Sequence, residues 1–127
     1  MTARRIHRLG DLQLRILKVL WNRQRANVSE VQAALGDDRL AYTTVATMLR
    51  KMEVRGLVRH RLEARSFVYR AAVGAEAVSR GMAVHLLERL FEGSLADMVR
   101  HLLSNREVSR EELAALERLI AERKKAL

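Results

Sequence analysis

Apolar residues recur every three or four positions along most of the chain, which is the spacing of one face of a helix. This pattern predicts a first helix from Asp11 to about Arg23, with Asp11 as its N-terminal cap. A second, short helix is predicted to begin at Ser29 through a capping box with Gln32 and to stop at Gly36.

The third predicted helix runs from Tyr42 to Arg55 and ends at Gly56. Its apolar side carries Val45, Met48, Leu49 and Met52. Its remaining surface carries Thr43, Thr44, Thr47, Arg50 and Lys51. Threonine is β-branched and a mediocre helix former, so three threonines at this edge indicate a purpose other than helix stability.

A hairpin is predicted directly after this helix. Residues 57–62 alternate apolar and basic side chains, which is the period of a strand, and residues 66–70 form a second strand. The connection at residues 63–65 is short but lacks the glycine that such turns prefer.

The predicted hairpin is rich in arginine. Alternation places Arg59 and Arg61 on one face of the first strand, with Arg65 at the tip. Together they form a surface that suits phosphate contacts, although a charged strand edge that prevents aggregation explains the same residues. Phe67 and Tyr69 are expected to pack in the core rather than to stack on bases.

After Val73 the helical period returns, and it is interrupted at Gly93. Two capping sequences, SLAD from Ser94 and SREE from Ser109, begin two further helices. Three amphipathic helices in so short a segment cannot bury their own apolar faces well, because small units have a poor ratio of volume to surface.

Packing against a second copy would bury these faces, so we expect a two-fold homodimer. The interface residues predicted from the pattern are Leu86, Leu90, Leu95, Val99, Leu102, Leu113, Leu116 and Ile120. The predicted fold class is therefore mainly α with a small β wing. A winged helix-turn-helix DNA-binding domain is expected over residues 1–73 and a three-helix dimerisation domain over residues 74–127.

The charge is unevenly distributed. The chain of 127 residues has a net charge of +9, and residues 1–73 hold fifteen Lys and Arg against six Asp and Glu. Residues 74–127 hold nine of each kind. An arginine-rich genome would explain many arginines but not why balancing acids are confined to the second part. Only the first part is expected to face a polyanion.

Composition also excludes several classes of function. The absence of cysteine excludes disulfides, thiolate metal sites and thiol catalysis. The four histidines are scattered, and no catalytic or phosphate-loop motif is present, so we expect no metal, no cofactor and no enzymatic activity. The longest uncharged run has ten residues, too few to cross a bilayer, and no signal sequence is visible, so a cytoplasmic protein without membrane insertion is expected.

The predicted order of elements is that of a DNA reader, in which one helix enters the major groove and a basic hairpin reaches the flanking backbone. The expected DNA-contacting residues are Tyr42, Thr43, Thr44, Thr47, Arg50, Lys51, Arg59, Arg61 and Arg65. One of the threonines would instead serve only as a helix cap if the pattern were purely structural. Arg4, Arg5 and Arg8 either track a phosphate strand or form a solubilising end.

The segments LGDLQLRILKVLW, VSEVQAAL, AYTTVATMLRKMEVRGLVRH and VSREELAALERLI resemble the BlaI/MecI/CopY-type family of penicillinase repressors. The resemblance implies a homodimeric transcriptional repressor of a resistance or envelope-stress gene, bound to a palindromic operator in double-stranded DNA. It places Thr43, Thr44 and Thr47 toward the bases, Arg50 and Lys51 toward the backbone, and Arg65 on the wing. It also implies a membrane sensor-protease as a partner.

The sequence departs from the family pattern at three points. His101-Leu102 aligns with the Asn-Phe bond that the partner protease cuts in the antibiotic-resistance members, so either such cleavage does not occur here or its specificity differs. The cysteine pairs of the copper-sensing members are absent. Ala46 stands where some members place a longer polar side chain, which implies a different operator preference.

Two other functions remain open from the residues alone. One is an architectural DNA-binding protein without operator choice, and the other is a winged-helix module whose basic face binds an acidic protein.

Overall fold

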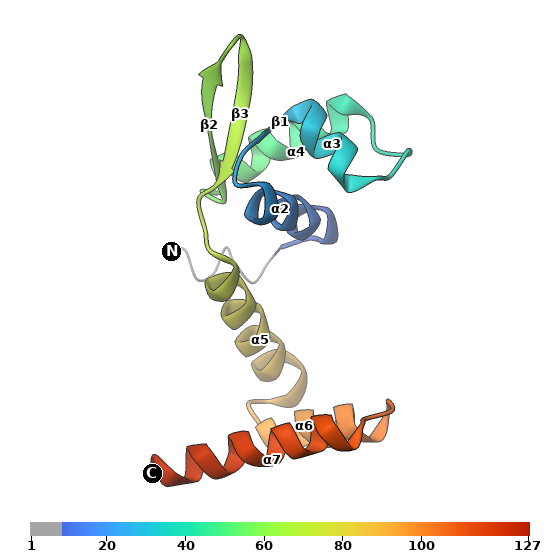
Figure 1. The fold of residues 1–127 in the computed structure, drawn as a ribbon, viewed down its shortest axis with the longest axis vertical. Helices are drawn as coiled ribbons and strands as arrows, with labels where there is room; N and C mark the ends of the chain where they lie inside the picture. The colour runs from blue at the N-terminus through green and yellow to red at the C-terminus, as the bar shows by residue number, and fades with distance from the viewer. Residues whose placement is uncertain (1–8) are drawn as a thin grey trace. The chain divides into compact units, whose positions relative to one another are not determined.

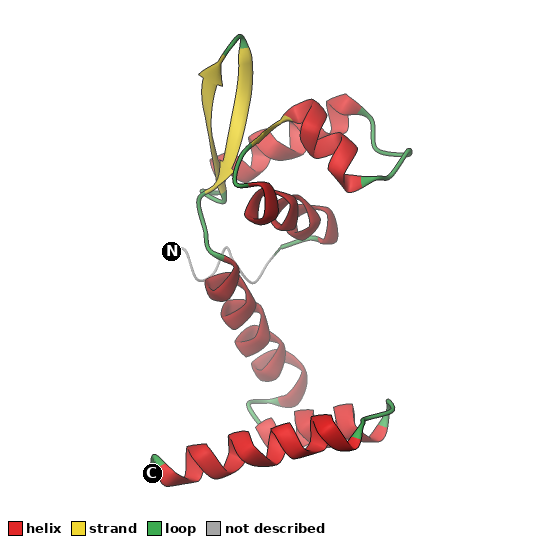
Figure 2. Cartoon of the chain, viewed as in Figure 1, coloured by secondary structure: helices red, strands yellow, loops and turns green. Residues whose placement is uncertain are grey.

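A computed structural model describes residues 9–127 (Figure 1). The elements in chain order are α2 (Asp11–Arg23), β1 (Ala26–Asn27), α3 (Val28–Leu35), α4 (Tyr42–Val54), β2 (Val58–Glu63), β3 (Ser66–Ala71), α5 (Ala75–Phe91), α6 (Leu95–Ser104) and α7 (Arg110–Lys125). The fold is mostly helical with one small antiparallel sheet, which confirms the predicted fold class (Figure 2). Predicted residues Arg4, Arg5 and Arg8 lie outside the described part of the chain.

The chain divides into two compact units. The first ends at Leu86 and the second comprises Leu87–Leu127, so the division falls within α5. The assignment of DNA binding to residues 1–73 and of dimerisation to residues 74–127 stays a prediction.

The hydrophobic core of the first unit is built by α2, α3, α4, the sheet and the start of α5. Its fully buried side chains include Ile16, Leu17, Leu20, Val31, Val45, Leu49, Met52, Leu57, Val58, Tyr69 and Val78. The apolar side predicted for α4 is confirmed, because Val45, Leu49 and Met52 are all fully buried.

Two predicted helix caps are wrong. Helix α2 is capped by Gly10, whose N–H donates to the Gln13 side-chain oxygen at 3.1 Å, and Asp11 is its first helical residue. Helix α3 begins at Val28 and is capped by Asn27, because Asn27 is the last residue of β1 and still extended.

Asn27 forms a capping box with Glu30 instead of the predicted pair of Ser29 and Gln32. The Asn27 side-chain oxygen accepts the Glu30 N–H at 2.8 Å, and the Glu30 carboxylate accepts the Asn27 N–H at 2.9 Å. Gln32 donates to the Leu40 carbonyl at 2.9 Å and so fixes the loop that leads to α4. The predicted stop at Gly36 is confirmed by its left-handed φ of 63°.

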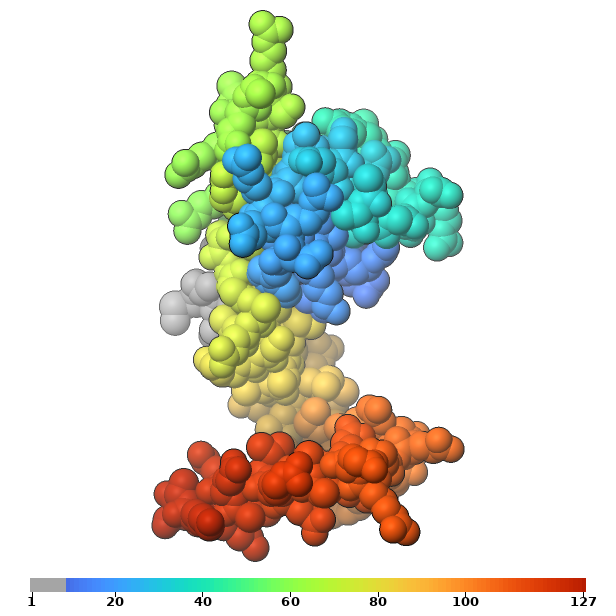
Figure 3. Space-filling model, viewed as in Figure 1, coloured from blue at the N-terminus to red at the C-terminus, as the bar shows by residue number. Residues whose placement is uncertain are grey.

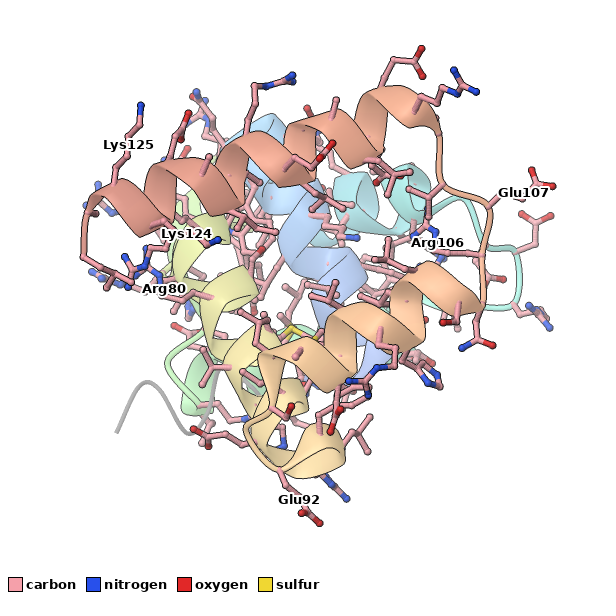
Figure 4. The ribbon with its side chains drawn as sticks, turned by 90° about the horizontal axis from the view of Figure 1, so that it is seen from below. Arg80, Glu92, Arg106, Glu107, Lys124 and Lys125 are labelled. Atoms are coloured by element: carbon pink, nitrogen blue, oxygen red, sulfur yellow. The ribbon has the colours of Figure 1, made fainter. Side chains whose placement is uncertain are left out.

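The caps predicted for the second unit are confirmed. The Ser94 hydroxyl accepts the Asp97 N–H at the start of α6, and the Ser109 hydroxyl accepts the Glu112 N–H at the start of α7. Glu92 and Gly93 both have positive φ in the turn that ends α5, and Arg106 and Glu107 lie in the turn between α6 and α7 (Figure 4).

The sheet has the order β1-β3-β2, with both pairs antiparallel. Strands β2 and β3 form the predicted hairpin, called the wing below, which projects from the rest of the first unit (Figure 3). The base of the wing is tied to α2, since the Trp21 indole N–H donates to the Val73 carbonyl at 2.8 Å.

Candidate nucleic-acid interface

The polar edge of α4 is fully available to a ligand. Tyr42, Thr43, Thr44, Thr47, Arg50 and Lys51 are all exposed. The cap residue of α4 is Ala41, which supplies no side-chain hydrogen bond, so no threonine caps the helix. The alternative of a threonine cap is therefore wrong, and among the described residues no side chain accepts from the first N–H groups of the helix.

Thr47 and Arg50 are linked on this edge. The Arg50 guanidinium donates to the Thr47 hydroxyl at 3.2 Å, one helical turn apart. A hydroxyl next to a guanidinium presents a donor, an acceptor and a positive charge within one turn of a helix, a combination suited to base edges and phosphates.

A groove separates α4 from the wing tip. It has a volume of about 360 Å³ and is lined by Asn27, Val28, Ser29, Tyr42, Ala46, Arg50, Arg65, Ser66, Phe67 and Tyr69. Two of the predicted cations, Arg50 and Arg65, face it from opposite sides, and Tyr42 adds an aromatic wall.

Phe67 does not pack in the core as predicted and is 51% exposed, whereas Tyr69 does and is 2% exposed. The reason is position along the wing. Tyr69 pairs with His60 near the wing base, while Phe67 pairs with Leu62 near the tip, where no helix covers the sheet. Leu62 is itself 68% exposed.

The predicted alternation of the wing is confirmed by its register. Arg59 pairs with Arg70 and Arg61 pairs with Val68. These residues lie on one face of the wing, and the paired residues His60 and Tyr69 lie on the other. Within residues 9–127, neither Arg59 nor Arg61 has an ion pair or side-chain hydrogen bond. These two side chains and Arg70 line a recess of about 350 Å³.

One carboxylate serves this arginine face. Glu63 accepts from Arg25 at 2.8 Å and from Arg70 at 3.1 Å. The second Arg70 terminal nitrogen, Nη1, is buried and has no partner among the described residues. The face therefore carries more guanidinium groups than its single carboxylate can neutralise.

Arg65 stands at the wing tip in a strained turn. The two-residue connection consists of Ala64 with φ 47° and Arg65 with φ 67°. Positive φ at both positions is the pattern of a type I′ turn, which normally uses Asn or Gly. Arg65 is exposed and has no partner among the described side chains.

The inner face of the wing carries a contact that the sequence did not suggest. His60 Nδ1 lies 2.6 Å from the Glu53 carboxylate on α4. The His60 ring also contacts Phe67 and Tyr69, with centroid distances of 4.5 and 5.4 Å. Burial raises the pKa of the Tyr69 hydroxyl, and the nearby Glu53 carboxylate raises it further, against an opposing effect of Arg50.

The predicted dimerisation residues are accessible in the single chain. Leu86, Leu90, Leu95, Leu102, Leu113 and Ile120 are all exposed, while Val99 and Leu116 are half-buried. Neither α6 nor α7 has a buried side chain, and the two helices do not pack closely on each other.

Among residues 9–127, no three His, Cys, Asp or Glu side chains come together as metal ligands. In the same part of the chain, no helix combines the length and apolarity needed to cross a membrane.

Comparison with known proteins identifies the relatives of this chain. The family described as penicillinase repressor matches residues 9–122. The penicillinase repressor of Bacillus licheniformis is 29% identical over 122 residues, which are 95% of each chain. The transcriptional regulator BlaI of Mycobacterium tuberculosis is 32% identical over 93% of this chain and 86% of its own. A mutant of MarR from E. coli, solved in complex with operator DNA, has a TM-score of 0.52 at 18% identity over 95% of this chain and 84% of its own, a likeness of fold alone.

Proposed function

The chain belongs to the penicillinase repressor family, whose members are transcriptional repressors and not enzymes, and we propose that it represses transcription as a homodimer bound to a palindromic operator. The observation that carries the proposal is the exposed threonine edge of α4, placed beside a groove with cations on both sides. In this arrangement α4 enters the major groove and reads bases, and the wing contacts the backbone.

Each predicted contact has a chemical role in this proposal. Thr43, Thr44 and Thr47 present hydroxyls to base edges or phosphates and methyls to thymine methyl groups. The first N–H groups of α4, which no side chain caps, favour a phosphate. Arg50 and Lys51 contact the backbone, with Tyr42 at the edge of the groove.

The wing contributes sequence-independent affinity. Arg59, Arg61 and Arg65 have no acidic partner among the described residues, so binding a phosphate costs them no existing ion pair. Each neutralised phosphate releases counterions, and the affinity therefore falls with salt concentration.

Homodimer formation is supported by the second unit. Its helices α6 and α7 expose apolar side chains such as Leu95 and Ile120, which are 63% and 57% exposed. Exposed apolar side chains that gather on one face of a helix are typical of a protein–protein interface. A two-fold dimer would place two copies of α4 on half-sites about one helical turn, or a multiple of it, apart.

Release from the operator differs from that of family members cut at an Asn-Phe bond. The aligned bond, His101-Leu102, lies in α6, with both residues exposed. A sensor-protease partner that requires Asn-Phe would find neither residue here. We therefore propose that release uses a partner of different specificity or does not involve cleavage.

Selection of bound fragments from a random duplex library tests the proposal. We expect a single palindromic motif and a preference over random DNA of at least ~10³ at physiological salt. Binding with a steep salt dependence but no motif would indicate an architectural protein instead. Failure to retain any duplex would leave the protein-interaction module.

A further inference from the structure

The contact between His60 and Glu53 joins the two parts of the proposed DNA-binding surface. Glu53 lies on α4, one turn after Arg50, and His60 lies on β2. Their 2.6 Å separation between Nδ1 and the carboxylate oxygen is that of a strong, charge-assisted hydrogen bond. Both side chains are about one third exposed.

The outer part of the wing has little else to hold it against α4. Along β2 only Val58 is buried, and along β3 only Tyr69 is buried. Both lie at the wing base, since Val58 pairs with Ala71 and Tyr69 pairs with His60. Beyond this level the inner face carries only Leu62 and Phe67, and both are exposed.

The other side-chain attachments of the wing act on a different face. Glu63 binds Arg25 and Arg70, and all three belong to β2, β3 or the segment just before β1. They tie the wing to the rest of the sheet, not to the recognition helix. The contact between Glu53 and His60 is the side-chain hydrogen bond that joins α4 to the wing among the described residues.

We propose that His60 and Glu53 are positioning residues that hold the wing at a fixed distance from α4, so that Arg50 and Arg65 engage the operator at the same time. The proposal rests on the DNA-binding function proposed above. The His60 ring packs on Phe67, which lies two residues after Arg65. Holding His60 against α4 therefore also restrains the wing tip. The width of the groove between Arg50 and Arg65 then depends on this pair.

A positioning role and a simple charge effect predict opposite changes in operator affinity when Glu53 is removed. Glu53 is an acid on the basic side of the molecule, one turn from Arg50, so its removal should strengthen binding to any DNA if charge alone mattered. A positioning role predicts the opposite for the operator, because a wing that is free to move must be ordered upon binding.

The decisive variant is Glu53→Ala, which raises the net charge by one and suits a helix. We expect its affinity for the operator to fall about fivefold, while its affinity for random duplex DNA stays equal or rises. Glu76→Ala is the matched control, since Glu76 pairs with Arg80 on α5 and makes the same change of charge away from the wing. The control should bind operator DNA as tightly as the unmodified protein or more tightly.

Two substitutions of His60 separate the ring from its donor. His60→Phe keeps the aromatic contacts but loses the donor to Glu53, and it should weaken operator binding as Glu53→Ala does. His60→Asn keeps a donor near the Nδ1 position and should restore part of the affinity. The double variant Glu53→Ala/His60→Phe should be no weaker than either single variant, because the two residues act through one contact.

Amide hydrogen exchange of the DNA-free protein provides a second readout. Exchange across residues 58–71 should become faster in Glu53→Ala and in His60→Phe and stay unchanged in Glu76→Ala. Unchanged exchange in the first two variants, or operator affinity equal to or above that of the unmodified protein, would overturn the positioning role. Failure of the unmodified protein to bind any operator would instead overturn the proposed function, and the exchange data would still show whether the pair restrains the wing.

Discussion

Arg59 lies directly opposite Arg70 across the antiparallel pair of β2 and β3. Like charges at directly opposed positions destabilise a sheet, and only Arg70 has a carboxylate partner, Glu63. The fold alone gives no reason for a cation at position 59. Binding of a polyanion to this face would give such a reason, because the polyanion would neutralise both guanidinium groups.

Replacing Arg59 with Gln should therefore have opposite effects on folding and on binding. We expect the free energy of unfolding to rise by about 0.5 kcal/mol, because the cross-strand repulsion disappears. Affinity for every DNA sequence should fall, and the slope of log affinity against log salt should decrease in magnitude by about one. Urea unfolding and salt titrations of DNA binding measure the two effects. Arg89→Gln, on α5, is the control for charge, and equal salt slopes in the two variants would remove Arg59 from the binding surface.

A glycine in the turn at the wing tip is expected to stabilise the fold. Ala64 has φ 47°, a conformation that costs a residue with a Cβ about 1 kcal/mol or more. Ala64→Gly should raise the free energy of unfolding by about 0.5–1 kcal/mol, because glycine adopts positive φ without this cost. Ala83→Gly, at an exposed position in the interior of α5, should lower it by about 1 kcal/mol. If both substitutions destabilise, the turn does not have the described conformation.

The sequence predicted those features that depend on local period. The alternation of residues 57–62 determined which face of the wing carries Arg59 and Arg61, and the helical period identified the buried side of α4. The helix caps at Asp11 and Ser29 were wrong because neighbouring residues compete for the same role. Asn27, and not Ser29, caps α3 because pairing with Val68 keeps Asn27 in an extended conformation.

The features that were missed depend on contacts between distant segments. Phe67 and Tyr69 have the same parity in the strand. Tyr69 lies at the level where β3 pairs with β1 and is buried, whereas Phe67 lies beyond the end of β1 and is exposed. Glu53 and His60 are seven residues apart with Gly56 between them, so no helical or strand period brings them together. The path of the chain after Gly56, whose φ is 80°, does so.

Thr47 is expected to contribute to base specificity. The hydroxyl that accepts from Arg50 also faces solvent, so it can contact a base edge, and the methyl can contact thymine. Thr47→Val removes the hydroxyl and Thr47→Ser removes the methyl, and each should change preference at particular operator positions by about 1 kcal/mol or more. Binding to a panel of singly substituted operators measures this. A uniform loss across the panel would assign Thr47 to the backbone.

Stability at alkaline pH is expected to depend on Tyr69. Its pKa in the fold is raised above the ordinary value of 10.0, chiefly by burial, so the folded state favours the neutral phenol. From about pH 10 upward the unfolded chain therefore releases this proton more readily, and the free energy of unfolding falls as pH rises toward the pKa of the folded state. Tyr69→Phe should lack this component of the decline above about pH 10, whereas Tyr42→Phe should retain it. Identical pH profiles in Tyr69→Phe and the unmodified protein would contradict the assignment.

The second unit should form the dimer through the exposed apolar faces of its helices. Leu116→Asp or Ile120→Asp places a charge in the predicted interface, where it would be buried without a partner. We expect either variant to shift from dimer to monomer in equilibrium sedimentation at micromolar concentration. Affinity for the full palindrome should then fall by about 100-fold or more, because the second half-site no longer binds as part of the same complex. Binding to an isolated half-site should be unchanged.

Leu127→Asp introduces the same charge at a 94% exposed residue outside the predicted interface and should leave both properties intact. Sedimentation of the unmodified protein as a monomer, or full palindrome affinity in Ile120→Asp, would reject a dimer built on these helices.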